Sequence, residues 1–478
     1  MPGDEEFIYV NGIDPETGQY AVPPVSVSEL AAKVRAKPGA AAVSHTRGPA
    51  LESFGVPYGV DLNKLGEAGW GIVFYEDTPQ EVRNALAPLI ELRHGQAGNL
   101  FKELDYKKGE QARDWYRRHG ATVGTPDPEI VPYYLLLVGP PAQIPFEFQY
   151  LIGVDYAVGR LDFATPAEYG QYAASIQAYE SAASLPNKKE ITFWGTCHPG
   201  DGATNLSASF LVNPLANGIA DAAGALKRPV NVDSGYERTL YLGDDATKAG
   251  LLATLHGATP PAMLFTASHG LAIRSGRANQ RSDQGALLCQ DWPGFGSVHA
   301  DHILSAEDIG ADANVNGLVA FVFACFGGGT PDIDQFPMDL SDAGNSPKLA
   351  PEPFVAALPR RLLAHPKGSA LAVIGHIDRA WGYLIRPPQT SGAQITYFHN
   401  SLRAILNGDR IGSAISQQFG GHFATLCALL LTAVSPTTPD FMKPSDRDLV
   451  NYWIERNDAQ NYVILGDPAV RIRKELLS

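Results

Sequence analysis

Two side chains that could act as a nucleophile and a base follow two apolar segments of the sequence. Cys325 ends the run AFVFAC at residues 320–325, and three glycines follow one residue later. His269 ends the run AMLFTASH at residues 262–269, and Gly270 comes directly after it. A thiol has an ordinary pKa near ~8.5, so a nearby imidazole is needed to remove its proton or to stabilise the thiolate at neutral pH. The pair therefore has the composition of a nucleophile and its acid–base partner.

The two apolar runs have the length and composition of strands that are buried on both faces of a parallel sheet. The carboxyl ends of such strands lie at the edge where open α/β proteins form their binding crevice, so neighbouring strands would bring Cys325 and His269 to one substrate. The backbone N–H groups of Gly270 and Cys325 could then bind the oxyanion of an acyl-transfer intermediate, and the glycines would let a substrate backbone approach. Each residue taken alone also has an ordinary interpretation, a core cysteine and a histidine at a strand end.

Short β-branched or aromatic runs alternate with amphipathic stretches along most of the chain, which predicts a mostly parallel sheet flanked by helices. Thr78 and Thr165, each followed by proline, are expected to cap helices, and so is Asp244 or Asp245. The polar, helix-breaking residues 183–190 indicate a domain boundary. We therefore predict an N-terminal α/β subdomain over residues 1–185 and a catalytic subdomain over residues 186–478.

Composition excludes several classes of protein. The formal charge of −14 argues against a nucleic-acid-binding surface, which needs clustered Lys and Arg. No run reaches the roughly 18 consecutive apolar residues of a membrane span, and the acidic N-terminus has no signal-peptide pattern. The four cysteines form no C-x-x-C pair and no metal-finger spacing, which favours free thiols in a reducing cytoplasm.

The order of the motifs resembles the caspase-like superfamily of cysteine peptidases, clan CD, and within it the gingipain-type catalytic domain of family C25. TASHG at residues 266–270 and FVFACFGGG at residues 321–329 are similar to its two catalytic blocks, and NYVILGDPAVRIR at residues 461–473 is similar to its closing strand. The similarity extends from near Tyr133 to the C-terminus. It implies a caspase-like α/β/α sandwich with a mostly parallel sheet and a smaller N-terminal α/β subdomain.

The resemblance also implies roles for individual residues. Cys325 would be the nucleophile, His269 the general acid and base, and the amides of Gly270 and Cys325 the oxyanion hole. The loop HPGDGATN at residues 198–205 resembles the loop that brings one acid toward the histidine and a second acid into the substrate pocket. His198 takes the first of these positions and Asp201 the second.

An acidic pocket residue would favour Arg or Lys before the scissile bond, because a desolvated carboxylate matches a cationic side chain. Trp381 resembles a wall of that pocket, and Asp378 belongs to the same loop. Two alternatives remain open: Asp201 could instead cap the following helix, and Asp378 could form a surface ion pair with Arg379.

These expectations describe a cytoplasmic cysteine endopeptidase that forms a thioacyl-enzyme on a protein or peptide substrate. No metal or organic cofactor is required, although structural calcium is compatible with the resemblance, and a regulatory protein partner is expected because such an enzyme needs control. One alternative is a catalytically idle caspase-like module for recognition or signalling, suggested by His198 in place of an acid. Another is an amidohydrolase that acts on small amides.

Overall fold

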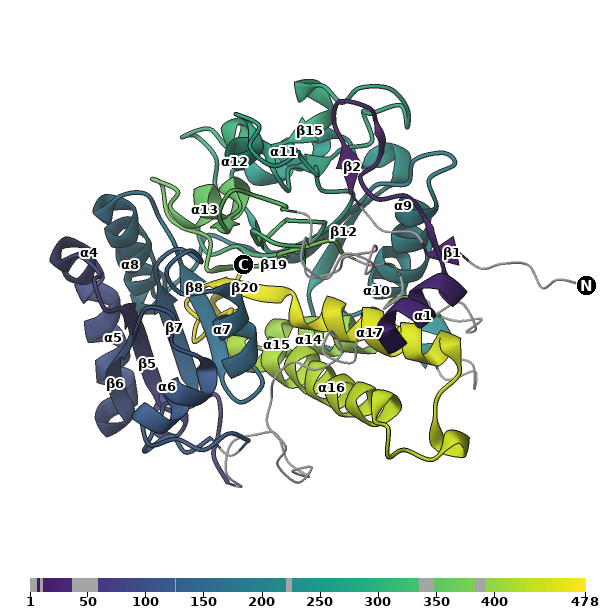
Figure 1. Cartoon of the computed structure of the whole chain (residues 1–478). Coiled ribbons are helices and arrows are strands. Elements are labelled where there is room, and N and C mark those ends of the chain that lie inside the picture. Colours follow the sequence, from purple (N-terminus) through teal and green to yellow (C-terminus); the bar gives the residue numbers. More distant parts are fainter. Residues whose placement is uncertain are drawn as a thin grey trace, which may run out of the picture.

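The computed structural model describes residues 7–8, 12–36, 59–124, 126–220, 226–334, 348–380, 382, 385 and 393–478. Its centre is a ten-stranded sheet with helices packed on it (Figure 1). The predicted fold class, an α/β sandwich with a mostly parallel sheet, is confirmed. None of the described helices is long and apolar enough to cross a membrane.

The sheet consists of two parallel halves that meet at one antiparallel seam. In spatial order its strands are β12 (Glu237–Leu242), β9 (Lys188–Gly195), β13 (Pro261–Ala267), β16 (Val319–Phe323), β19 (Ala372–His376), β20 (Tyr462–Gly466), β8 (Ala157–Leu161), β7 (Tyr134–Val138), β5 (Trp70–Tyr75) and β6 (Phe101–Tyr106). Neighbouring strands are parallel except for β19 and β20. The closing strand β20 therefore runs with the strands of the first half of the chain.

The helices that cover the sheet come between the strands along the chain. The longer ones are α4 (Gln80–Ala85), α5 (Ala87–Ala97), α6 (Ala112–Arg118), α7 (Phe146–Ile152), α8 (Pro166–Ser181), α9 (Gly202–Ser207), α11 (Lys248–Leu255), α13 (Ala357–Leu363), α14 (Thr396–Leu406), α15 (Ile411–Ile415), α16 (Gly421–Val434) and α17 (Asp446–Gln460). Alternate residues of β5 show that both faces are covered, because Ile72 packs in the cluster that includes α5 and α8, whereas Val73 packs in the cluster of α6 and α7.

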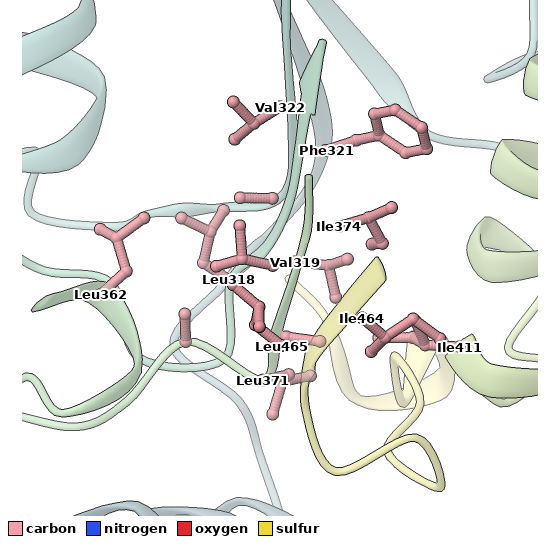
Figure 2. Close-up of a cluster of buried hydrophobic side chains, with 14 of the residues drawn as sticks. Leu318, Val319, Phe321, Val322, Leu362, Leu371, Ile374, Ile411, Ile464 and Leu465 are labelled. Atoms are coloured by element: carbon pink, nitrogen blue, oxygen red, sulfur yellow. The ribbon is translucent and has the colours of Figure 1, made fainter. Parts of the chain in front are cut away.

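The strand that precedes Cys325 lies in the middle of the largest core (Figure 2). Side chains of β16, β19 and β20 meet residues of α13 and α15 there, among them Val319, Phe321, Val322, Ile374, Ile464, Leu465, Leu362 and Ile411. Full burial of each such side chain stabilises the folded state by about 1.5–3 kcal/mol relative to leaving it exposed. The ends of β16 are therefore held rigidly in place.

Some helix starts differ from the sequence prediction. Thr165 caps α8 in a reciprocal capping box with Glu168, as expected. Thr78 makes no cap, because α4 begins after Pro79 without a side-chain hydrogen bond. The cap of α11 is Thr247, whose hydroxyl accepts from the amide of Gly250, and the two aspartates proposed for this role lie in the preceding 3-10 turn.

The first described residues of the chain do not join the neighbouring N-terminal half. Helix α1 (Val27–Ala36) packs against α17, and the hairpin of β2 (Ile13–Asp14) and β3 (Gln19–Tyr20) lies beside the segment around Leu271 (Figure 1). The boundary predicted at residue 185 remains a prediction about folding units, because one sheet continues across it through the pairing of β8 with β20.

Candidate active site

The structure brings the predicted pair to one edge of the sheet. Strands β13 and β16 are parallel neighbours, with Ala267 opposite Phe323. His269 and Cys325 each follow two residues later, and both side chains are fully buried. The amide of Ser268 donates to the carbonyl of Phe323 at 3.1 Å, which extends the pairing toward the site.

The backbones of Gly270 and Cys325 touch. A Cβ atom on Gly270 would lie 1.9 Å from the carbonyl oxygen of Cys325 and 3.1 Å from its amide nitrogen, so only glycine allows this approach. No backbone carbonyl in the described part of the chain accepts from either of the two amides. Their proximity suits the binding of one oxyanion by both N–H groups.

The chain turns sharply just after Cys325. Phe326 has a φ of 57°, a left-handed conformation that costs a non-glycine residue about 1–2 kcal/mol. The turn is fixed by the amide of Phe326, which donates to the carbonyl of Asp378 at 2.8 Å, and by that of Gly328, which donates to His376 at 2.8 Å. Such a turn sets the direction of the Cys325 side chain.

The glycines after Cys325 have a different role from the one expected. Instead of lining a path for substrate, Gly328 packs against the backbone of β19, where a Cβ would lie 2.8 Å from the oxygen of Gly375. Gly329 packs in the same way against β18 (Phe354–Val355), where a Cβ would lie 2.7 Å from the oxygen of Phe354. The glycine run therefore permits close packing of the loop.

The Cys325 thiol is shielded from solvent. Its sulfur accepts a hydrogen bond from the amide of Ala380 at 3.2 Å. Burial raises the pKa of this thiol strongly, and the amide of Ala380 and the charge of Arg379 only partly oppose that shift. The thiol is therefore protonated in the state that the structure describes.

Asp201 is the residue that holds His269. Its Oδ2 lies 2.7 Å from His269 Nε2 and accepts from the hydroxyl of Thr204 at 2.5 Å. Burial would raise the pKa of Asp201, but His269 and the hydrogen bonds from Thr204 and Tyr20 outweigh burial and hold that pKa well below its usual range. The ionised carboxylate fixes the orientation of the imidazole, the task that the sequence assigned to His198.

Asp201 also caps α9, because its carboxylate accepts from the amides of Ala203 and Thr204. The carboxylate is thus committed to the helix start and to His269, so the geometry favours the capping alternative over a pocket floor. The ring of His198 is fully buried and packs edge-on against Trp292, with 5.1 Å between ring centroids. Burial and the charge of His269 lower the pKa of His198 to about 4, which keeps this ring neutral.

Asp378, which was also predicted to line the pocket, instead supports the loop after Cys325, because its carbonyl accepts from the amide of Phe326. Asp378 is fully buried, and its Oδ1 accepts from the amide of Arg379 at 2.7 Å. Burial and the neighbouring charge of Asp334 raise the pKa of Asp378 to about 7. The guanidinium of Arg379 lies 4.0 Å from Asp378 Oδ1 and 2.8 Å from Asp334 Oδ2. The predicted ion pair of Asp378 with Arg379 therefore forms, but in the interior and not on the surface. Trp381 lies outside the described residues.

Two functional contacts that sequence reasoning missed come from the N-terminal hairpin. The amide of Gly12 donates to His269 Nδ1 at 3.1 Å, and a Cβ on Gly12 would lie 3.5 Å from Cys325 Sγ. The hydroxyl of Tyr20 donates to Asp201, and its ring lies edge-on to His269. The run IDPETGQY has the turn residues of a hairpin, which could have predicted the hairpin but not its position in the site.

Across the described residues, no group of three or more His, Cys, Asp or Glu side chains could hold a metal ion. The protein residues alone supply a thiol, an oriented imidazole and two adjacent amides. These are the components of nucleophilic acyl transfer.

The model of peptidase family C25 matches residues 120–473, a span that includes His269 and Cys325. Among solved structures, "Structure of Protease" is 13% identical, with a TM-score of 0.49, and covers 85% of this chain and 79% of that chain. The complex of the pro- and mature domains of Porphyromonas gingivalis RgpB is 10% identical, with a TM-score of 0.40, and covers 85% and 80%. No curated protein matches the sequence. The family match spans well over half of the residues, and the chain therefore belongs to peptidase family C25, a family of cysteine peptidases.

Proposed function

We propose that this chain is an endopeptidase that cleaves peptide bonds with Cys325 and His269. His269 accepts the proton of the Cys325 thiol, and the resulting thiolate attacks the substrate carbonyl carbon. The amides of Gly270 and Cys325 bind the oxyanion that forms. His269 gives its proton to the leaving nitrogen, the C–N bond breaks, and a thioacyl-enzyme forms. Water, deprotonated by His269, then hydrolyses the thioester and restores the thiol.

The observation that carries this proposal is the contact between Gly12 and the catalytic pair. A peptide N–H donates to His269 Nδ1 at 3.1 Å, while the same residue lies against Cys325 Sγ. A general acid must lie within hydrogen-bond reach of the atom that it protonates. The site thus accommodates a polypeptide main chain, with a peptide nitrogen in the position of a leaving group.

Asp201 has the role of a positioning residue in this proposal. Its short hydrogen bond to His269 Nε2 places the other ring nitrogen toward the substrate. The preference for Arg or Lys before the scissile bond remains a prediction without support from Asp201, because that carboxylate is held by His269 and Thr204.

A catalytically idle recognition module is the second candidate, and the buried state of the thiol favours it. Cys325 is fully buried, and burial raises its pKa. An idle module keeps this state, whereas a peptidase must expose the thiol when a substrate or a partner replaces Gly12. We also propose a cytoplasmic location, consistent with four free thiols, and control by a protein partner.

The test is a positional-scanning peptide library assayed with the wild type, Cys325→Ala and Cys427→Ala. Cys427 lies in α16, away from the site, and serves as a matched control for loss of a thiol. Cleavage should disappear in Cys325→Ala with folding retained and persist in Cys427→Ala. Cleavage by Cys325→Ala would overturn the assignment, and failure of a peptidyl acyloxymethyl ketone to label Cys325 under any condition would favour the idle module.

A further inference from the structure

The N-terminal hairpin occupies the cleft beside the catalytic pair with its main chain. Ile13 pairs in parallel with Leu271, and the amide of Ala272 donates to the carbonyl of Ile13 at 3.0 Å. The hairpin closes on itself through the amide of Ala21, which donates to Gly12 at 3.0 Å. An added strand that pairs by its backbone is a common way for a protein to hold an extended peptide.

The direction of the hairpin shows which side of the cleft it occupies. The nitrogen of Gly12 faces His269, and the chain then leads away from Cys325 along the segment that begins at Leu271. In a peptide bond under attack, the nitrogen that receives the proton of the general acid begins the leaving segment. Gly12 therefore occupies the position of the first residue after a scissile bond, and Ile13 and Asp14 occupy the next two.

Each of these positions has its own surroundings. Gly12 has a φ of 115°, which glycine adopts without strain. Ile13 is only 3% exposed and packs in an apolar cluster of Leu271, Ile273, Ala286, Leu288, Trp292 and Ile303. Asp14 Oδ2 lies 3.2 Å from the guanidinium of Arg274. The cleft thus offers in succession a position whose backbone conformation favours glycine, an apolar pocket and a cation.

The tip of the hairpin at Glu16 and Thr17 is exposed, whereas Gly18 packs against the backbone of Gly296. Glu16 pairs with Arg277 where both side chains are about half exposed, and the amide of Val298 donates to Pro15. An open cavity of about 570 Å³ remains between the hairpin and the loops that carry Phe326 and Leu349. The hairpin therefore covers the cleft without filling all the space beside it.

We propose that this cleft is the leaving-side substrate site, and that it selects glycine, then a branched aliphatic residue, then an acidic residue after the scissile bond. The hairpin fills the site as an intramolecular substrate mimic, so a substrate reaches Cys325 only when the hairpin is displaced. This inference rests on the proposed peptidase function, and its test is a binding measurement that needs no cleavage.

The test opens the cleft and then refills it. Ile13→Asp removes the apolar side chain that anchors the hairpin. Gly12→Val should displace the hairpin in a different way, because a β-branched residue is strained at the φ of Gly12. The readout is the rate at which iodoacetamide alkylates Cys325 in the folded protein, measured by mass spectrometry of the peptide that contains Cys325, because the three other cysteines are also free thiols. The heptapeptide Gly-Ile-Asp-Pro-Glu-Thr-Gly, the sequence of residues 12–18, is then added as a protecting ligand.

Alkylation should be about 30-fold faster in the opened variants than in the wild type, which corresponds to loss of one buried aliphatic side chain. The heptapeptide should protect Cys325, and Asn in place of its Ile should weaken protection at least about tenfold. Asn in place of its Asp should weaken protection about threefold, and Arg274→Ala should abolish that difference while the matched control Arg277→Ala keeps it.

Equal alkylation rates in the wild type and both opened variants would show that the hairpin does not occupy the cleft. Equal protection by the Ile and Asn peptides would overturn the selectivity. Both results are separable from failure of the peptidase proposal, which would show instead as protection and selectivity intact in a protein that cleaves no peptide.

Discussion

Two buried histidine–aspartate pairs lie at the same edge of the sheet, and they differ in what faces the second ring nitrogen. His269 Nε2 lies 2.7 Å from Asp201, and His376 Nε2 lies 3.2 Å from Asp458. Both histidines are fully buried, and each follows or ends a strand next to β16. Burial and a carboxylate partner alone therefore do not separate a catalytic imidazole from a structural one.

The partner of the second ring nitrogen, Nδ1, distinguishes the two histidines. His376 Nδ1 contacts the backbone oxygen and nitrogen of Asp378, at 2.8 and 3.2 Å, only two residues away in the chain. His269 Nδ1 accepts from Gly12, which is 257 residues away and belongs to a hairpin at the surface of the cleft. The first partner is fixed by the local fold, whereas a substrate can replace the second. An exchangeable partner beside a thiol is what makes His269 a candidate base.

The largest expected effect comes from removing each imidazole in turn. His269→Ala should lower kcat/KM for a cleaved peptide by about 10³–10⁴-fold, since it removes the proposed acid–base group. Its loss of stability should be smaller than that of His376→Ala, because the Asp201 carboxylate keeps its hydrogen bonds from Thr204, Tyr20 and the amide of Ala203. His376→Ala should keep kcat/KM within about tenfold but lower the free energy of unfolding by about 3–5 kcal/mol, because Asp458 loses a buried partner. Kinetics in the Ile13→Asp background and urea unfolding measure the two effects.

The distinction between His269 and His376 would be wrong if both substitutions changed kcat/KM and stability to the same extent. Equal losses of kcat/KM at equal stability would mean that His376 takes part in the chemistry. Equal losses of stability would mean that the Asp201 pair is also a structural element.

Much of this site could be predicted from local sequence patterns. Cys325 and His269 follow apolar runs whose composition predicts buried parallel strands, and such strands end at one edge. The adjacency of the two strands was only a condition of that interpretation, and the structure meets it. The helix cap at Thr165 and the mostly parallel sheet were predicted and are confirmed. These features depend on neighbours in the sequence or on general rules of sheet topology.

The contacts that orient the His269 imidazole could not be predicted from local sequence patterns. Asp201 and His198 are three residues apart in one loop, and only the start of α9 at Gly202 turns the Asp201 carboxylate toward His269. Gly12 and Tyr20 reach the site from a hairpin more than 180 residues away in the chain. The sequence has a turn signal there but no signal for where the hairpin packs.

A third buried histidine, His198, sharpens the comparison because its ring packs on Trp292 instead of a carboxylate. Its pKa is about 4 in the folded protein, against about 6.5 in an unfolded chain. Between these values only the unfolded state binds the proton, so stability falls as pH decreases from about 6.5 to 4, by up to about 3 kcal/mol. Above pH 6.5 the group has no effect.

His198→Gln should remove this contribution. The difference in unfolding free energy between the variant and the wild type, measured by urea denaturation, should shift by about 3 kcal/mol in favour of the variant between pH 7 and pH 4. Carboxylates titrate in both proteins and largely cancel in that difference. Parallel pH profiles of the two proteins would show that His198 is solvated or charged in the folded state.

The smallest expected effect tests whether the hairpin is an exchangeable partner. Tyr20→Phe removes one hydrogen bond to the ionised Asp201 carboxylate, and such bonds contribute about 1.5–3 kcal/mol. The lower value corresponds to about a tenfold larger open population, so iodoacetamide should alkylate Cys325 about tenfold faster. Tyr241→Phe on the edge strand β12 is the matched control and should leave the rate unchanged. If Tyr20 instead belonged to the catalytic assembly, its loss would lower peptide cleavage without exposing the thiol, and His269 would then be held from both sides as firmly as His376.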